Sequence, residues 1–285
     1  MTIQLMFITN DADIAKEAEA SGVDRIFIDL EKIGKWERQG HLDTVLSSHS
    51  MSDISTVRAK IEKCELLVRI NPVHEHTASE IDEAIDRGAD VLMLPMFTTA
   101  EEVAYFVARV GGRAKTCLLL ETPQALVRIN EILDIKGIDE VHLGLNDLYL
   151  GMKLDFMFEL ISCGVVDFAC RMLKARGIKY GFGGIAKIGK GVVPAEMILA
   201  EHYRLGSEMV ILSRSFHNRA VNLEELRQRV DFGQEVRKIR ERENAIRQWS
   251  SSEMNSNFNK IKSLVQEHCR CLRREKWELN EYINL

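Results

Sequence analysis

The stretch CLLLETPQALVRINEILDIKGIDEVHLGLNDLYLGM, residues 117–152, has the pattern of a strand, a helix, a second strand and a loop. The apolar run Cys117–Leu120 is typical of a strand buried on both faces, and Val141–Leu145 repeats that pattern. Between the two runs, Thr122 is a suitable helix N-cap and Pro123 a suitable first helical residue. The stretch therefore predicts two consecutive βα units of a parallel α/β fold.

A carboxylate follows each of these strands, Glu121 after the first and Asp147 after the second. Consecutive strands of a parallel sheet usually lie side by side, so their carboxyl ends meet at one edge. Two carboxylates that converge there are costly unless a proton or a cation lies between them. Mg²⁺ or Mn²⁺, held by carboxylates, water and substrate oxygens, fits such a pair. We predict that both residues bind a divalent metal ion; the alternative is two ordinary carboxylates at helix starts.

The same alternation of strand and helix patterns runs through the first 220 residues. The predicted strands are Ile3–Thr9, Arg25–Leu30, Leu66–Asn71, Val91–Met96, Cys117–Leu120, Val141–Leu145, Lys179–Gly184 and Met209–Ser215. Their number and regular spacing predict a (β/α)₈ barrel, in which active sites lie on the C-terminal rim. A doubly wound open sheet is the alternative, but no glycine-rich dinucleotide turn follows the first strand.

Helical patterns fill the intervals and then continue beyond the last strand. The main predicted helices are Asp11–Ser21, Asp53–Cys64, Thr77–Arg87, Thr99–Val110, Asp155–Arg176 and Pro194–Arg204, with a long loop or short irregular helix over Ile33–Ser52. From residue 221 the chain is highly charged, and we predict amphipathic helices over Leu223–Trp249, a polar linker over Ser250–Asn257 and a further helix to Leu285. This suggests a barrel over residues 1–220 and an extension over 221–285 that packs on the barrel or on a neighbouring subunit.

The composition is that of a globular protein, with 46% of its 285 residues hydrophobic, 28% charged and a net charge of −5. An acidic balance argues against binding to nucleic acid, and no apolar run approaches the ~20 residues that a membrane span needs. The N-terminal sequence MTIQLMFITN lacks the features of a signal peptide, and the six cysteines have neither disulfide nor zinc spacing. We therefore expect a cytoplasmic protein without a nucleic-acid or membrane partner.

Further polar residues follow other predicted strands and should gather on the same rim. They include Asp29 and Glu31 after the second strand and Arg69 near the end of the third. A metal ion held by Glu121 and Asp147 could chelate a 2-oxo acid through its carboxylate and keto oxygens, with Arg69 stabilising negative charge on an enolate. The alternative for Arg69 is an ion pair with Asp29 or Glu31. The set fits a reaction that makes or consumes an enolate.

The substrate is expected to be held by groups around the metal ion. Backbone N–H groups that open the helix after the sixth strand could bind its carboxylate. Many barrels bind phosphate after strands seven and eight, so the loop over residues 183–190 could face an anionic end of the substrate; the alternative is a flexible solvated loop. The predicted substrate contacts are Gly144, Leu145, Asn146, Asp29 and Arg214.

Five segments resemble one known family in their order along the chain. They are DLE at 29–31, VRINP at 68–72, AIDRGADVLMLPM at 84–96, LLLETPQAL at 118–126 and GIDEVHLGLNDLYLGM at 137–152. Over roughly Ile3 to Phe216 the sequence resembles the class II pyruvate aldolase and citrate lyase β-subunit family, also called HpcH/HpaI. The resemblance implies a (β/α)₈ barrel that often assembles through C-terminal helices, here a homo-oligomer. It also implies metal ligation by Glu121 and Asp147, enolate stabilisation by Arg69 and a role for Asp86 in organising metal-bound water.

The sequence departs from that family at the residue after Glu31. The aldolase branch has a histidine there that assists proton transfer, the CoA-ester lyase branch has an aspartate, and this chain has Lys32. A lysine is a poor base unless burial lowers its pKa. Glu31 and Lys32 are therefore kept as catalytic candidates, with metal-bound water and His74 or His76 as alternative bases.

The predicted function is that of a metal-dependent carbon–carbon lyase. It would cleave or form a 4-hydroxy-2-oxo acid through a pyruvate enolate, with Mg²⁺ or Mn²⁺ as cofactor. One alternative is a CoA-ester lyase of the citramalyl-CoA, malyl-CoA or citrate lyase β type, which uses the same metal site. A second alternative, suggested by Lys32 and by the long C-terminal extension, is a non-catalytic barrel with a scaffold role.

Overall fold

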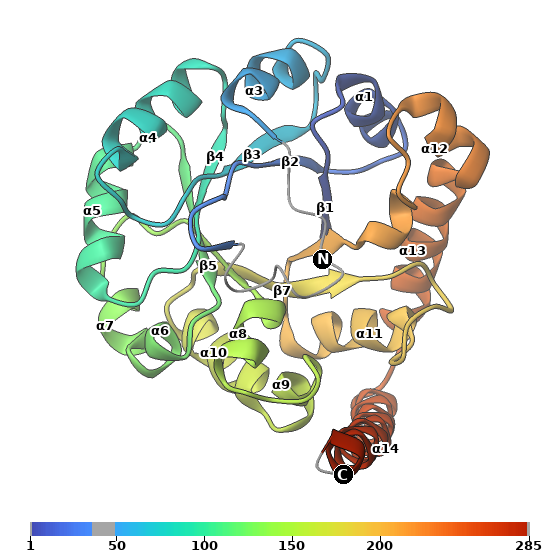
Figure 1. The fold of residues 1–285 in the computed structure, drawn as a ribbon. Coiled ribbons are helices and arrows are strands. Elements are labelled where there is room, and N and C mark those ends of the chain that lie inside the picture. The colour runs from blue at the N-terminus through green and yellow to red at the C-terminus, as the bar shows by residue number, and fades with distance from the viewer. Residues whose placement is uncertain (1, 36–48, 284–285) are drawn as a thin grey trace.

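The computed structural model describes residues 2–35 and 49–283, and it has the predicted (β/α)₈ barrel (Figure 1). All neighbouring strands are parallel and follow the order of the sequence, and the barrel closes where the last strand pairs with the first. The strands are β1 Gln4–Ile8, β2 Arg25–Asp29, β3 Glu65–Arg69, β4 Val91–Leu94, β5 Lys115–Leu120, β6 Glu140–Leu143, β7 Lys179–Ile185 and β8 Met209–Leu212.

Helices surround the barrel on its outside (Figure 1). They are α1 Ala12–Ala20, α3 Met51–Arg58, α4 Thr77–Asp86, α5 Ala100–Val110, α6 Pro123–Val127, α7 Ile129–Leu133, α8 Leu145–Gly151, α9 Glu159–Ser162, α10 Val165–Ala175, α11 Ala195–Leu205, the 3₁₀ helix η1 Arg214–Phe216, α12 Leu223–Arg229, α13 Phe232–Ile246 and α14 Ser251–Ile283. Most of the loop predicted over Ile33–Ser52 lies outside the described residues. The single helix predicted over Asp155–Arg176 is two helices, because Gly164, at a φ of +86°, separates α9 from α10.

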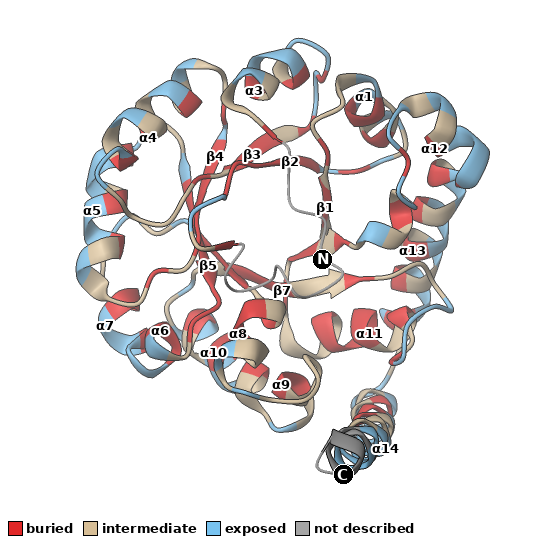
Figure 2. Cartoon of the chain, viewed as in Figure 1, coloured by how far each residue is buried: buried red, intermediate tan, exposed pale blue. Residues whose placement is uncertain are grey.

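The strands are largely buried, and each surrounding helix has buried and exposed positions (Figure 2). The buried apolar side chains form two clusters, one between the barrel and its helices and one inside the barrel. The buried interior residues are Met6, Phe27, Leu67, Val91, Met93, Cys117, Leu119 and Met209. Interiors of this kind are packed cores rather than pores. The interior layer therefore separates the N-terminal end of the barrel from the C-terminal rim.

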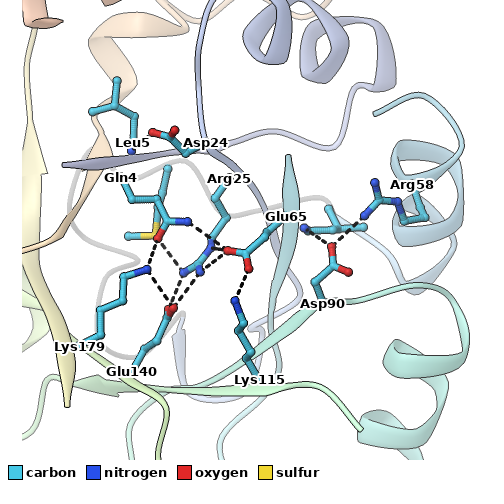
Figure 3. Close-up of polar contacts among 12 residues, drawn as sticks. Gln4, Leu5, Asp24, Arg25, Arg58, Glu65, Asp90, Lys115, Glu140 and Lys179 are labelled. Atoms are coloured by element: carbon cyan, nitrogen blue, oxygen red, sulfur yellow. Dashed lines mark hydrogen bonds and ion pairs between the residues drawn. The ribbon is translucent and has the colours of Figure 1, made fainter. Parts of the chain in front are cut away.

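A network of charged side chains closes the N-terminal end of the barrel (Figure 3). Arg25 is completely buried there and donates to both carboxylate oxygens of Glu140, at 2.7 and 3.1 Å. It also donates to Glu65 at 2.6 Å. Lys115 binds Glu65 and Lys179 binds Glu140, at 2.5 and 3.2 Å. Each buried charge in this network thus has an opposite charge beside it, which buried ions require.

The helices after β8 complete the barrel before the extension begins. α12 and α13 both contact α1, and α13 also packs on α11. The apolar face of α13, which includes Phe232, Val236 and Ile239, is buried. Glu243 on α13 is buried as well and accepts hydrogen bonds from the Ile3 backbone, at 2.9 Å, and the Tyr203 hydroxyl. The boundary predicted at residue 220 therefore falls inside the eighth βα unit.

The extension is a single long helix, α14, that packs against α11 and α9 of its own chain (Figure 1). The linker predicted over Ser250–Asn257 is wrong, because most of it forms the first turns of this helix. The Ser250 backbone and hydroxyl donate to Glu253 at 2.7 and 2.8 Å, which caps the helix N-terminus. Asn257 is buried and donates to the Met197 carbonyl at 3.0 Å, so its polar side chain serves the contact with α11. No helix within residues 2–35 and 49–283 is long and apolar enough to cross a bilayer.

Two buried histidines should make the fold sensitive to acid. Burial lowers the pKa of His142 to about 4 and that of His202 to about 3, and one nitrogen of each ring has no hydrogen-bond partner in the described structure. The unfolded chain binds these protons near pH 6.5, so stability should fall as the pH drops below that value, by about 1.4 kcal/mol per pH unit for each histidine. We expect the free energy of unfolding, measured with urea between pH 7 and 5, to fall with this slope. In His202→Gln the slope should be smaller by about 1.4 kcal/mol per pH unit, the contribution of one proton. An unchanged slope in that variant would show that His202 does not contribute to the sensitivity to acid.

Candidate active site at the C-terminal rim

Glu121 and Asp147 lie next to each other at the ends of two paired strands. Glu121 directly follows β5 and Asp147 lies in the first turn of α8, just after β6. The strands are in register at Leu120 and Leu143, and both carboxylates are buried, with 3% and 8% of their surfaces exposed. Burial raises the pKa of Glu121 well above its usual value, and the charge of Asp147 raises it further. The structure thus brings together the two carboxylates that the sequence predicted as metal ligands.

Two backbone features fix the position of the Glu121 carboxylate. The Met96 N–H donates to Glu121 Oε1 at 3.2 Å, and Met96 adopts a left-handed conformation with a φ of +54°. Such a conformation is uncommon for residues other than glycine and often marks functional sites. On the other side, a Cβ atom at Gly144 would lie 2.5 Å from Glu121 Oε2. Glycine is therefore required at position 144 to leave room for this carboxylate.

We expect Gly144→Ala to displace the Glu121 carboxylate and to weaken Mn²⁺ binding by about tenfold or more, as loss of a positioning contact commonly does. Gly233→Ala is the matched control, since Gly233 lies in α13 and the nearest atom to its added Cβ is the flexible Arg237 side chain at 3.3 Å. A manganese titration of both variants is the measurement. Equal affinity in Gly144→Ala and Gly233→Ala would show that the space beside Glu121 is not needed.

Arg69 is held by two carboxylates at the end of β2, Asp29 as the last residue of the strand and Glu31 just after it. Its Nε and Nη2 donate to the two oxygens of Asp29 at 2.8 and 2.7 Å, and its Nη1 lies 3.4 Å from Glu31. The negative charge of Glu121 also acts on this arginine. Although burial by itself would raise the pKa of Asp29, the charges of Arg69 and Lys35 outweigh burial and lower it strongly. Arg69 thus lies between the Asp29–Glu31 pair and the predicted metal ligands.

Protein donors surround the carboxylate of Asp29. Besides Arg69, it accepts hydrogen bonds from the Lys35 ammonium at 2.6 Å and from the Glu31 N–H at 3.2 Å. A carboxylate has about four acceptor sites, and protein donors occupy this number at Asp29. These contacts anchor Arg69, and the substrate contact predicted for Asp29 stays a prediction.

The lysine at the rim is Lys35 rather than Lys32. The Lys32 side chain is exposed, and its backbone N–H donates to Asn71 Oδ1 at 2.8 Å. Lys35 is buried, and its ammonium lies 2.6 Å from Asp29 and 3.7 Å from Glu31. The exposed Lys32 side chain therefore does not support the catalytic role predicted for it. The sequence reasoning named Lys32 and missed Lys35.

The remaining predicted residues are dispersed. Asp86 is exposed at the C-terminal end of α4, which leads into the start of β4 and so lies at the barrel end opposite the rim. Arg214 is exposed at the start of η1, after β8. The Gly144 N–H donates to the Leu120 carbonyl at 3.0 Å and so cannot serve a substrate carboxylate as predicted. Leu145 and Asn146 do open α8, where the first backbone N–H groups lack intrahelical partners.

The histidine at the rim is His49, rather than His74 or His76, which the sequence suggested as bases. His74 Nδ1 lies 3.0 Å from the Pro72 carbonyl and from Thr77 within its own loop, and His76 is exposed. His49, which had no recognisable spacing, is buried at the rim and accepts the Asp29 N–H on Nδ1 at 2.9 Å. A neutral His49 must then carry its proton on Nε2, and burial lowers its pKa. In that tautomer it can donate a hydrogen bond but not accept a proton at Nε2.

Among the described residues, carboxylates outnumber cationic side chains at the rim. Within the described part of the chain, four carboxylates face two cationic side chains there, a net formal charge of −2; these are Asp29, Glu31, Glu121 and Asp147 against Arg69 and Lys35. No cluster of three or more histidine, cysteine or acidic side chains in ligand geometry occurs among residues 2–35 and 49–283. The protein thus offers two adjacent carboxylate ligands and leaves other positions to water and substrate, as Mg²⁺ sites commonly do.

A family model described as HpcH/HpaI aldolase/citrate lyase matches residues 4–159, which include Arg69 and both predicted metal ligands. The chain belongs to this family. Members of the HpcH/HpaI family are aldolases and lyases that generally depend on a divalent metal ion. The family resemblance read from the sequence is therefore confirmed.

Solved structures share the fold at low sequence identity. An HpcH/HpaI aldolase from Desulfitobacterium hafniense DCB-2 is 17% identical, with a TM-score of 0.58 over 74% of this chain and 86% of that one. An aldolase/citrate lyase family protein from Burkholderia cenocepacia J2315 is 14% identical, with a TM-score of 0.60 over 80% and 94%. The citrate synthase SbnG is 15% identical, with a TM-score of 0.58 over 76% and 89%. The search of curated proteins found no match.

Proposed function

We propose that this protein is a metal-dependent carbon–carbon lyase that cleaves or forms a 4-hydroxy-2-oxo acid through a pyruvate enolate. The observation that carries the proposal is the adjacency of the buried Glu121 and Asp147, with Arg69 close enough for its charge to act on Glu121. Two buried carboxylates repel each other unless a cation or proton is shared between them. In a family of aldolases and lyases, Mg²⁺ or Mn²⁺ is the cation that this donor set fits.

Each residue of the site has a separate task in this proposal. Glu121 and Asp147 hold the metal ion, which when bound supplies Lewis-acid polarisation of the 2-oxo acid. Arg69 donates two of its five N–H groups to Asp29 and holds Nη1 3.4 Å from Glu31, so its guanidinium keeps further N–H groups that can stabilise the oxygen that becomes negative in the enolate. Asp29 keeps the guanidinium in a single orientation, which avoids reorganisation during the reaction.

The proposal predicts exchange of the pyruvate methyl protons in deuterated water that depends on added Mn²⁺. Arg69→Ala should slow this exchange by about 10²-fold or more, since one charged donor to an oxyanion is lost, and should leave Mn²⁺ binding in place. Arg87→Ala is the control, because Arg87 forms an exposed pair with Glu83 on α4. The proposed chemistry would be refuted if the unaltered protein with Mn²⁺ did not exchange the pyruvate methyl protons. It would also be refuted if Arg69→Ala exchanged them at the same rate as the unaltered protein. Cleavage of a hydroxyacyl-CoA in preference to the free acid would indicate a CoA-ester lyase.

The setting of the protein is also part of the proposal. We infer a small-molecule substrate in the cytoplasm and a homo-oligomer that uses the distal part of α14. Ile261 and Val265 of this helix are buried on their own barrel, whereas Trp277 is 75% exposed further along it. An exposed tryptophan on an amphipathic helix is a suitable contact for a second subunit.

A further inference from the structure

Lys35 is a buried cation beside a site that is proposed to bind a cation. Its ammonium lies 2.6 Å from Asp29 Oδ2 and 3.7 Å from Glu31 Oε2, and only 6% of the residue is exposed. Removing an ammonium group from water costs several kcal/mol unless opposite charges compensate it. Asp29 and Glu31 provide that compensation, so Lys35 is part of the rim.

The position of Lys35 links it to Arg69 through shared carboxylates. Asp29 Oδ2 accepts from both Lys35 and Arg69 Nη2, at 2.6 and 2.7 Å. Glu31 Oε2 likewise faces both cations, at 3.7 and 3.4 Å. Two carboxylates held between two cations have little freedom to rotate. The orientation of the Arg69 guanidinium therefore depends on Lys35 through these two carboxylates.

Lys35 also changes the electrostatics of the rim. It places one positive charge within 4 Å of both Asp29 and Glu31, and this charge is lost when the lysine is replaced by a neutral residue. A positive charge in a poorly solvated site repels a divalent ion over several ångströms. Lys35 should thus weaken metal binding while it improves the placement of Arg69. Its removal should therefore raise the affinity for the metal ion and lower the rate of proton exchange.

We propose that Lys35 is a positioning residue of the active site: it fixes Arg69 through Asp29 and Glu31, and it limits the affinity for the divalent ion. This inference rests on the proposed function, since it takes Glu121 and Asp147 as the metal ligands. It goes beyond that proposal in giving a role to Lys35, whereas the sequence analysis named Lys32 as the catalytic candidate after Glu31. A lysine with a merely structural role would lower metal affinity and turnover together when it is removed.

The test compares Lys35→Met, Lys35→Gln and Lys35→Arg with the unaltered protein. Mn²⁺ binding is measured by titration without substrate, and the exchange of pyruvate methyl protons is measured at saturating Mn²⁺. The two neutral variants should bind Mn²⁺ about tenfold more tightly and exchange protons at least about tenfold more slowly. Lys35→Arg should keep the Mn²⁺ affinity of the unaltered protein and recover part of the exchange rate. Lys32→Met should show neither change if Lys35 is the cation that matters.

The outcomes separate the inference from the proposed function. If the unaltered protein and Glu121→Gln bound Mn²⁺ equally well, the assignment of Glu121 as a metal ligand would be wrong. The inference about Lys35 would then fail with the proposed function. If Glu121 is needed for binding but neither neutral variant binds Mn²⁺ more tightly than Lys35→Arg, only the inference about Lys35 fails. The same effects from Lys32→Met instead of Lys35→Met would return the role to Lys32. Lys35→Arg keeps the charge and so remains informative if the neutral variants fold poorly.

Discussion

Glu121→Gln should abolish metal-dependent proton exchange and, at the same time, make the metal-free protein more stable. The first effect follows because an amide is a far weaker ligand than a carboxylate for Mg²⁺ or Mn²⁺. We expect the exchange rate at saturating Mn²⁺ to fall by about 10³-fold or more, the scale on which an essential electrostatic group acts. Asp147→Asn should give the same loss, because it removes the second of the two carboxylates.

The gain in stability follows from the pKa of Glu121. Burial and the neighbouring Asp147 charge raise that pKa, so ionised Glu121 costs free energy in the folded protein above its usual pKa near 4.3. Glutamine is neutral and similar in size, and its oxygen can still accept the Met96 N–H. We expect the Tm of the metal-free variant to rise by about 3 °C, which corresponds to roughly 1 kcal/mol in a protein of this size.

Thermal unfolding with a chelator and with Mn²⁺ measures both effects on one protein. Mn²⁺ should raise the Tm of the unaltered protein, by mass action, and leave that of Glu121→Gln unchanged. Glu131→Gln is the control, because Glu131 is an exposed carboxylate on α7 and should behave as the unaltered protein does. A lower Tm without metal, or a retained shift with Mn²⁺, would show that Glu121 is a structural carboxylate instead.

The barrel was predictable because its signals are local and repeated. The runs before Glu121 and Asp147 are buried strands of four to six residues, and parallel order followed from the helices between them. Adjacent strand ends then placed the two carboxylates together without further information. Where the signal depended on contacts distant in sequence, as at residues 250–257, a polar composition was mistaken for a linker, although Asn257 is buried against α11.

The finer assignments failed where spacing does not determine which side chain folds inward. Lys32 and Lys35 both follow the DLE segment, and only the chain path after Glu31 exposes the first and buries the second. His49 lies 20 residues after Asp29 along the chain, yet it accepts that residue's N–H. The need for Gly144 arises from the Glu121 side chain on the neighbouring strand, which no local pattern encodes. Contacts distant in sequence thus decided the roles of His49 and Gly144, whereas the path of the chain after Glu31 decided that of Lys35.

Arg25→Met should produce the largest loss of stability, at the end of the barrel opposite the site. Arg25 is fully buried and is the partner of both oxygens of Glu140 and of Glu65 (Figure 3). Methionine fills a similar length, but among the described residues it leaves the buried Glu140 with the partly exposed Lys179, at 3.2 Å, as its cationic partner. Removal of one partner from a buried ion pair typically costs about 3–5 kcal/mol, which predicts a Tm lower by about 10 °C.

The pH dependence of this loss gives the prediction a second, independent readout. Burial alone would raise the pKa of Glu140, but the hydrogen bonds and charge of Arg25 outweigh burial and lower it. Without Arg25 the folded protein should take up a proton on Glu140 at a higher pH, and protonation removes the unpaired charge. The cost of Arg25→Met should therefore shrink as the pH falls from 7 towards 5. The double variant Arg25→Met with Glu140→Gln should recover part of the loss at pH 7 for the same reason.

Arg58→Met is the matched control for burial. Arg58 pairs with Asp90 at 2.8 Å in the same region (Figure 3), but 29% of its side chain is exposed, so its loss should cost less than about 1 kcal/mol. Mn²⁺ affinity of folded Arg25→Met should equal that of the unaltered protein, because the apolar interior that includes Met93 and Leu119 separates Arg25 from the rim. Equal costs for Arg25→Met and Arg58→Met would show that the network at this end is solvated and contributes little to the fold.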